Sequence, residues 1–136
     1  MIELPPSTIP LQSWVFNAKA TRFVDGDTLD MTLDMGLHAL RLERLRLLNV
    51  NAPERKGVTR QAGDEALRYT MDWIGVHGRK HNADPGVGAP EWPFRVQTYK
   101  SDAFGRFLAY VWCVECGACL NDDLIADKMA NVDIRP

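Results

Sequence analysis

Residues 45–54 read LRLLNVNAPE, and together with VDGDT at residues 24–28 they organise the rest of the chain. A third stretch, DAFGR at residues 102–106, completes the set. The three stretches supply carboxylate and amide oxygens, two arginines and a glutamate. Hard divalent cations prefer oxygen ligands, and planar guanidinium groups match phosphate oxygens two at a time. Because a glutamate beside them can activate a water molecule, the set indicates phosphodiester hydrolysis.

The residues before, between and within the first two stretches are predicted to form three β-strands. Residues 14–23 are predicted to form a strand that ends at the Asp-Gly turn. Residues 28–34 alternate polar and apolar side chains, which is typical of a half-buried strand. A long third strand is predicted over residues 38–50, in which leucines alternate with Arg44 and Arg46. The two arginines are therefore expected to leave the core face.

The second half of the chain is predicted to supply two helices and two further strands. Apolar residues recur at helical spacing over residues 60–75. Strands are predicted over residues 94–99 and 107–114, and a short last helix over residues 120–129, with Asn121 near its start as a cap. The chain is thus expected to be mainly β with helices (α+β). Its predicted architecture is a five-stranded OB-type barrel with one long helix after the third strand and a short C-terminal helix.

Length and proline content divide the chain. Its 136 residues fit one domain. Three prolines within residues 1–13 indicate an extended N-terminal arm, which leaves residues 14–136 as the OB-fold domain. No apolar run reaches the length of a membrane span, and no secretory signal is evident, so a cytoplasmic location is expected. The formal net charge of −2 requires any nucleic-acid site to be a local basic cleft.

In order and spacing, the three stretches resemble the staphylococcal nuclease (thermonuclease) family. The resemblance rests on Asp-Gly-Asp-Thr, Arg-Leu-Leu-x-Val-x-x-Pro-Glu and Asp-x-x-Gly-Arg, and it covers about residues 18–132. It implies an OB-fold endonuclease or exonuclease that hydrolyses single- or double-stranded DNA or RNA with a divalent ion, calcium. The alternative is a catalytically weakened OB-fold module that binds nucleic acid or serves in an assembly.

The resemblance gives each matching residue an expected role. Arg46 and Arg106 would hold the phosphate and stabilise the charge of the transition state, and Glu54 would be the general base. The calcium ligands would be Asp27, Asn51 and the backbone carbonyl of Ala52. The residues expected behind these ligands or against the substrate are Asp25, Thr28, Asp102 and Phe104.

Each of these assignments has a simpler alternative. An Asp-Gly pair is ordinary hairpin chemistry, and Asp25 is either the first residue of that turn or a partner of the metal through water. Two surface arginines commonly form only weak salt bridges. Glu54 would then be a solvated loop acid.

The chain departs from the family pattern at two places. Asn51 stands where the family usually has aspartate, and the lost negative charge is expected to weaken calcium binding. Family members commonly continue into tyrosines and a further helix, whereas this sequence ends at residues 133–136. We therefore expect Phe104 to remain as a stacking ring and the partly uncovered barrel to form a symmetric homodimer.

Cys113, Cys116 and Cys119 lie outside the family pattern. Cys-x-x-Cys-Gly resembles a zinc knuckle, but a closed structural zinc site needs four ligands, so His77 or His81 or another chain would have to complete it. Reduced thiols are the alternative expectation in a cytosolic chain. The histidines are otherwise expected to be solvated.

Overall fold

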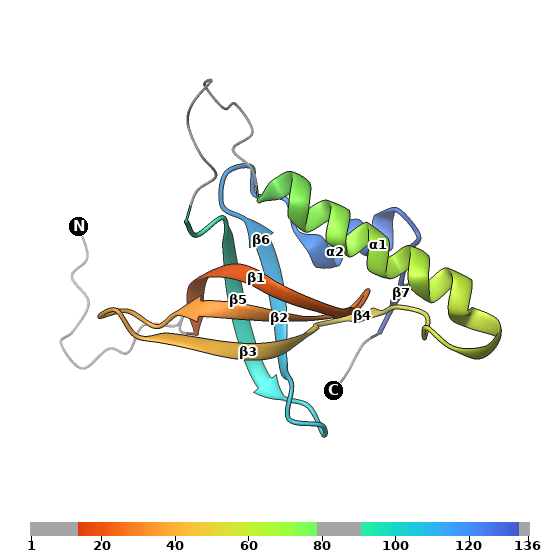
Figure 1. The fold of residues 1–136 in the computed structure, drawn as a ribbon, viewed down its shortest axis with the longest axis horizontal. Coiled ribbons are helices and arrows are strands. Elements are labelled where there is room, and N and C mark those ends of the chain that lie inside the picture. Colours follow the sequence, from red (N-terminus) through yellow and green to blue (C-terminus); the bar gives the residue numbers. More distant parts are fainter. Residues whose placement is uncertain (1–13, 79–90, 134–136) are drawn as a thin grey trace, which may run out of the picture.

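Five strands close into a barrel in the computed structural model, which describes residues 14–78 and 91–133. The barrel strands are β1 (Val15–Asp25), β2 (Thr28–Asp34), β3 (Leu40–Leu47), β5 (Phe94–Ser101) and β6 (Phe107–Cys113). They hydrogen-bond in the order β1-β2-β3-β6-β5, and pairing of β1 with β5 closes the barrel. The β3–β6 pair is parallel and the other pairs are antiparallel. The predicted fold class is confirmed (Figure 1).

The remaining elements lie against the barrel. They are β4 (Val50–Asn51), the 3-10 helix η1 (Gly57–Thr59), α1 (Arg60–His77), α2 (Leu120–Ala126) and β7 (Asn131–Val132). Along the described ranges, neither helix has the length and apolar character needed to cross a membrane. The predicted arm over residues 1–13 falls outside the described residues, as does His81.

The third strand is shorter than predicted. β3 ends at Leu47 because Asn49 has a positive φ of 63°, a conformation that breaks the extended backbone. The amide of Leu48 donates instead to Ala109 of β6, at 2.9 Å. The chain resumes as β4, which pairs with β7. The predicted strand over residues 38–50 is therefore two strands separated by a turn, and that turn brings the C-terminal segment beside the end of β3.

The core follows the alternation of apolar residues along the strands. Leu29, Met31 and Leu33 of β2 are buried while the residues between them are half-buried. α1 packs on β1 and α2 packs on β6, and the two helices also touch each other (Figure 1). At that contact the indole Nε1 of Trp73 donates to Asp123 Oδ2 at 2.8 Å. This bond ties α1 to α2.

The prediction that Asn121 caps α2 is wrong. The N-cap residue is Cys119, which makes no side-chain cap bond, and Asn121 lies in the first turn with 1% exposure. Its Nδ2 donates to the carbonyls of Leu48 and Ala109, both at 3.0 Å, and its Oδ1 accepts from the amide of Val111 at 3.1 Å. Asn121 therefore ties α2 to β6 and to the turn before β4, which a local capping pattern does not reveal.

Candidate functional site

Strand pairing brings the three sequence stretches to one end of the barrel. Thr28, at the start of β2, pairs with Arg46 near the end of β3. Leu45 pairs in parallel with Phe107, the first residue of β6. The β1–β2 turn, the end of β3 and the residues before β6 are therefore neighbours. β4 and β7 lie beside this end of the barrel (Figure 1).

Asp27 is at the centre of the candidate site and is only 7% exposed. Its Oδ1 accepts a hydrogen bond from the hydroxyl of Thr28 at 3.0 Å, and its Oδ2 accepts one from the amide of Ala52 at 2.9 Å. The Nη1 atom of Arg46 lies 3.3 Å from the same Oδ2. Four of the predicted site residues are thus in direct contact.

Arg46 is buried, with 4% exposure, whereas the strand alternation predicted that it would leave the core face. Its Nη1 donates to the carbonyls of Leu47 and Val50, at 3.2 and 2.5 Å. Residues 47–52 fold back over the end of β3 and cover Arg46. Its side chain therefore lies outside the apolar core and is still shielded from solvent. Arg44, which no such segment covers, is exposed as predicted.

Two further groups reach the Arg46 guanidinium from β4 and from the residue after β7. Asn51 Oδ1 accepts from Nη2 at 3.4 Å, and Asp133 Oδ2 lies 3.9 Å from the same nitrogen. The amide of Asp133 donates to the Asn49 carbonyl at 2.9 Å. Sequence reasoning missed Asp133, because only the pairing of β4 with β7 brings it here. It places a carboxylate close to Asn51, the position at which the resembled family has one.

Asp25 is half-buried, and its electrostatic neighbours show which charges converge on this site. Burial raises the pKa of the Asp25 carboxyl, and the nearby Asp27 carboxylate raises it further. Arg55, Arg106 and Arg46 act in the opposite direction. Both predicted phosphate-binding arginines are therefore electrostatic neighbours of the same carboxylate. Arg55 joins them, although the sequence assigned it only to a polar loop.

Asp102 orients Arg106. The Asp102 side chain is 4% exposed, and its Oδ1 accepts from the amides of Phe104 and Arg106 at 2.9 and 3.0 Å. Its Oδ2 accepts from the Arg106 Nε at 2.8 Å and lies 2.7 Å from Nη2. Burial pulls the pKa of Asp102 upward, but these hydrogen bonds outweigh it and hold the pKa below its ordinary value. Phe104 is 82% exposed, with the Arg106 guanidinium carbon 5.1 Å from its ring centre.

Glu54 is held at the rim of the site by its backbone. Its side chain is 76% exposed, and Lys56 Nζ lies 4.0 Å from its Oε2. The Glu54 carbonyl accepts a hydrogen bond from the Thr59 hydroxyl at 2.8 Å. The carboxylate is therefore open to water, as a general base must be, while the chain that carries it is fixed.

α1 positions the two loops of the site through a face of small residues. A Cβ at Gly63 would lie 2.5 Å from the Glu54 carbonyl oxygen, and one at Gly26 would lie 2.7 Å from the Ala66 Cβ. Thr70 donates to the Gly26 carbonyl at 2.6 Å. Residues 63, 66 and 70 share one helix face, so close approach of α1 fixes both the β1–β2 turn and the Glu54 loop. The spacing of these small residues was a sequence signal for this contact.

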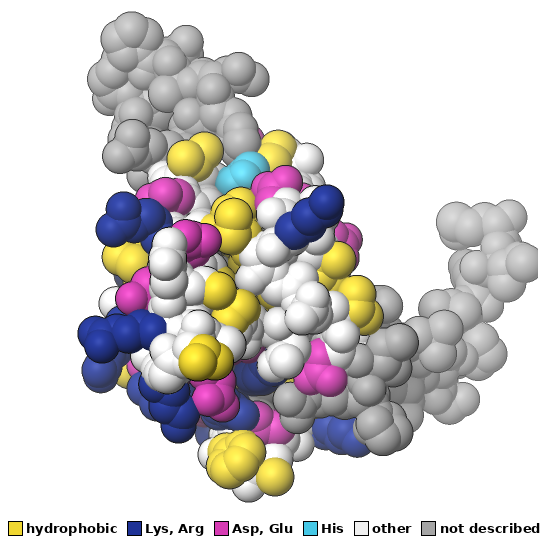
Figure 2. Space-filling model, turned by 90° about the vertical axis from the view of Figure 1, so that its right-hand side faces the viewer, with side chains coloured by type: hydrophobic (Ala, Val, Ile, Leu, Met, Phe, Trp, Pro, Cys, Tyr) yellow, Lys and Arg dark blue, Asp and Glu magenta, His cyan; other side chains and the backbone are white. Residues whose placement is uncertain are grey.

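Basic side chains flank the site despite the net negative charge of the chain. Figure 2 shows Lys and Arg side chains gathered along one flank of the molecule, with acidic side chains among them. Beside η1, a hollow of about 530 Å³ is lined by Arg60 and Arg68 together with Asp64 and Glu65. Arg55 Nε donates to Asp64 Oδ1 at 3.0 Å. Basic and acidic side chains are equal in number along this hollow, so the hollow itself is not a basic cleft.

The oxygen donors of the site suit a hard divalent cation. Asp27 is close enough to raise the pKa of the Asp25 carboxyl, an effect that a cation between or beside the two would relieve. The Asn51 amide oxygen and the Ala52 carbonyl belong to the same segment. However, Asp27 already accepts bonds on both oxygens. Calcium takes six to eight oxygen ligands, so water or substrate oxygens would have to complete its shell.

The three cysteines do not form one cluster. The ligand atoms of Cys113, Cys116 and His77 all lie within 4.8 Å of one another. Cys119 faces elsewhere, with its sulfur 3.9 Å from Asn121 Oδ1, and burial raises the pKa of its thiol. His77 is half-buried and packs on Trp73, with ring centres 4.2 Å apart. It was expected to be solvated unless it bound zinc.

Comparison with known proteins adds no assignment for this site. No protein-family model matches the chain. No curated protein matches it either.

Proposed function

We propose that the protein is a divalent-metal-dependent nuclease that hydrolyses phosphodiester bonds of DNA or RNA, as its resemblance to the staphylococcal nuclease family implies. One observation carries the proposal: the strand register brings Asp27, Arg46 and the segment that ends at Arg106, three separate parts of the chain, to one end of the barrel, where Arg46 lies 3.3 Å from Asp27. A mixed set of carboxylates and arginines at one open end of a barrel suits the recognition of a phosphate together with its counter-ion.

Within this proposal each side chain has a defined task. Arg106, held by Asp102, donates to the non-bridging oxygens of the phosphate, and Arg46 donates from the opposite side as charge develops on them. Glu54 accepts the proton of the attacking water, because its exposed carboxylate is accessible to solvent. Calcium, when bound by Asp27, Asn51 and Ala52, supplies Lewis-acid stabilisation of the phosphate charge.

The proposal is tested by incubating the protein with single-stranded DNA and RNA, with calcium and with chelator. Cleavage should require calcium. Arg106→Lys keeps the charge but loses the two-point geometry, so the cleavage rate should fall at least about a hundredfold. Arg44→Lys is the matched control. Arg44 is an exposed arginine on β3 that pairs with Asp30, and its substitution should leave the rate unchanged.

Cleavage that persists in chelator would contradict the metal requirement. If Arg106→Lys and Arg44→Lys cleave at the same rate, Arg106 does not have the proposed phosphate-binding role. Both variants should be purified in parallel, so that a contaminating nuclease is recognised by equal activity in every preparation.

A second candidate function is a binding module without catalysis, and the surroundings of Arg46 favour it. Its guanidinium donates to the Leu47 and Val50 carbonyls and to Asn51, and it neighbours Asp27. An arginine engaged in this way is part of the barrel's packing, and it must break some of these bonds to reach a phosphate. In a binding module it would keep them.

Asn51→Asp separates the two functions. The substitution nearly preserves shape and adds one negative charge close to Asp27. If calcium binds there, its affinity should rise by roughly tenfold or more. Because Arg46 already donates to Asn51, the new carboxylate would also pair with Arg46. Only the calcium-dependent part of the change in melting temperature therefore tests the metal. A variant whose melting temperature calcium does not raise would favour the binding module.

A further inference from the structure

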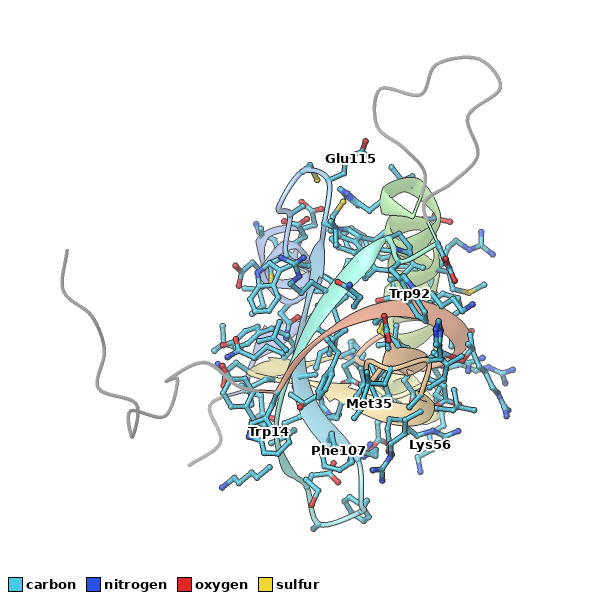
Figure 3. All side chains as sticks on the ribbon, turned by 90° about the vertical axis from the view of Figure 1, so that its left-hand side faces the viewer. Trp14, Met35, Lys56, Trp92, Phe107 and Glu115 are labelled. Carbon is cyan, nitrogen blue, oxygen red and sulfur yellow. The ribbon has the colours of Figure 1, made fainter. Side chains whose placement is uncertain are left out.

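A second cluster of ligating side chains lies far from the candidate nuclease site. His77 is the last residue of α1, Cys113 is the last residue of β6, and Cys116 lies in the turn that follows β6. α1 begins beside the nuclease site, where Gly63 contacts the Glu54 backbone. His77 lies fourteen residues further along, which at the helical rise is about 20 Å. In Figure 3 the labelled Glu115 marks this turn at the top of the molecule, away from Lys56.

From this cluster we infer a soft-metal site, for zinc, formed by His77 Nδ1 and the sulfurs of Cys113 and Cys116. The Cys116 sulfur lies 3.4 Å from His77 Nδ1, and all the ligand atoms are within 4.8 Å of one another. With Zn–S about 2.3 Å and Zn–N about 2.0–2.1 Å, a tetrahedral ion places sulfur and nitrogen about 3.5 Å apart and two sulfurs about 3.8 Å apart. The side chains need to move by no more than about 1 Å to meet that geometry.

The turn between the two cysteines is built to present both sulfurs together. The Gly117 amide donates to the Cys113 carbonyl at 2.9 Å, and the Cys113 amide donates to Ala118 at 2.8 Å. Gly117 has a φ of +76°, which residues with a side chain rarely adopt. The amides of Glu115 and Cys116 also donate to the Cys113 sulfur. Such donors stabilise a metal-bound thiolate.

The imidazole is oriented independently of the turn. The His77 ring packs on Trp73, and the Cys113 sulfur lies 3.6 Å from the His77 backbone oxygen. The end of α1 is thus held against the end of β6 without a metal. Core packing explains the buried Cys113 but not the exposed thiol of Cys116 beside His77.

The ligand set selects the class of metal and the form of the site. Thiolate and imidazole ligands favour zinc, whereas calcium requires oxygen ligands. Three protein ligands leave the fourth position to water or to an added ligand, in contrast to closed structural sites with four. An ion here would link α1 to the β6–α2 turn. This site is independent of the proposed nuclease chemistry.

The test is titration of the reduced full chain with Co²⁺ as a spectroscopic probe for zinc, followed by displacement with Zn²⁺. We expect one equivalent to bind with intense thiolate-to-cobalt absorption. Cys116→Ser changes an exposed residue and should preserve the fold, yet it should weaken binding more than the roughly hundredfold typical for loss of an outer partner. His77→Ala should weaken binding similarly.

Cys119→Ala is the matched control, because its sulfur contacts Asn121 and lies outside the cluster. It should bind cobalt with the affinity of the unmodified chain. The inference is overturned if the reduced chain binds no cobalt. It is also overturned if Cys116→Ser retains full affinity, or if Cys119→Ala loses as much affinity as Cys116→Ser. Circular dichroism of each variant separates loss of ligands from loss of fold.

Discussion

Gly63→Ala provides a direct test of the contact between α1 and the Glu54 loop. At an ordinary helix position, alanine is about 0.5–1 kcal/mol more favourable than glycine. At residue 63, however, the new Cβ would lie 2.5 Å from the Glu54 oxygen and 2.7 Å from the Glu54 carbonyl carbon. Normal contacts begin at 3.4 Å, so the loop or the helix must move by about 0.9 Å. Overpacking of this kind costs about 1–3 kcal/mol.

The same helix contains a matched control. Gly75 is exposed, and a Cβ added there has no atom of the described residues within 4 Å. Gly75→Ala should therefore raise the free energy of unfolding by about 0.5–1 kcal/mol, whereas Gly63→Ala should lower it by up to about 2 kcal/mol once the helix gain is set against the clash. Urea unfolding followed by circular dichroism measures both variants. Equal stabilisation by the two alanines would refute the close packing of α1 on the loop.

The displacement also has a consequence for the proposed chemistry. A shift of about 1 Å in a catalytic group can lower a rate about a hundredfold, so Gly63→Ala should reduce cleavage while calcium affinity is largely kept. Gly75→Ala should leave cleavage unchanged. If Gly63→Ala is destabilised but fully active, the close packing of α1 on the loop is supported and a catalytic role for Glu54 is contradicted.

Three further predictions concern other parts of the molecule. Burial and Asp27 raise the folded-state pKa of Asp25, so ionisation of this carboxyl opposes folding. Asp25→Asn should therefore stabilise the calcium-free protein at pH values above the raised pKa, and this gain should disappear below the ordinary pKa of 3.8. Denaturant unfolding at the two pH values measures the gain, and an equal gain at both would contradict the prediction. Asn121→Ala removes the side-chain partner of the Leu48 carbonyl and of the Val111 amide, whereas the Ala109 carbonyl still accepts from the Leu48 amide. The substitution should therefore cost about 2 kcal/mol in urea unfolding, and a much smaller loss would mean that water replaces the amide. Trp14, Met35 and Phe107 line an apolar groove (Figure 3), a surface that the expected symmetric dimer would cover. Light scattering should then report twice the chain mass of 15.3 kDa. A monomer mass at high protein concentration would count against the dimer.

The barrel could be predicted because its strands carry a local signal. The alternation over β2 and the helical spacing over α1 each follow from burial of one face of one element. Three sequential strands, a helix and two more strands then fit a five-stranded barrel, whereas the parallel pairing of β3 with β6 was not predicted. The predicted strand ends differ from the observed ones where the backbone changes conformation. One example is Asn49, whose positive φ ends the third strand. Asparagine adopts a positive φ more readily than most residues, so Asn49 was itself a weak turn signal within the run of apolar residues.

The candidate site could be predicted only where its residues belong to the three stretches of the motif. Asp27 and Arg46 were placed together by the motifs, and the strand register puts them in contact. Asp133, Arg55 and Gly63 were missed because their roles arise from tertiary contacts. Asp133 arrives through β4–β7 pairing, and Gly63 through helix packing. The zinc-knuckle pattern likewise suggested three cysteines, but the turn geometry selects two of them with His77.

The formal charges at the candidate site indicate how the proposed metal and the proposed substrate would depend on each other. The acidic groups within or beside it are Asp25, Asp27, Glu54, Asp102 and Asp133. The basic groups are Arg46, Arg55, Lys56 and Arg106. With five acids and four bases, the site carries one net negative formal charge. A phosphodiester brings another, and a divalent cation would neutralise both.

The same balance sets the two candidate functions apart. Without a cation, the arginines that face a phosphate are already paired with carboxylates, namely Arg46 with Asp27 and Arg106 with Asp102. Breaking the buried pair of Arg46 and Asp27 would leave an uncompensated charge, which is strongly unfavourable, whereas Arg106 can contact a phosphate while Asp102 still holds it. Nucleic-acid binding at this site should therefore depend on calcium even if no bond is cleaved. A module that binds single strands equally well in chelator would have to use another surface, and Arg106→Lys would then leave its affinity unchanged.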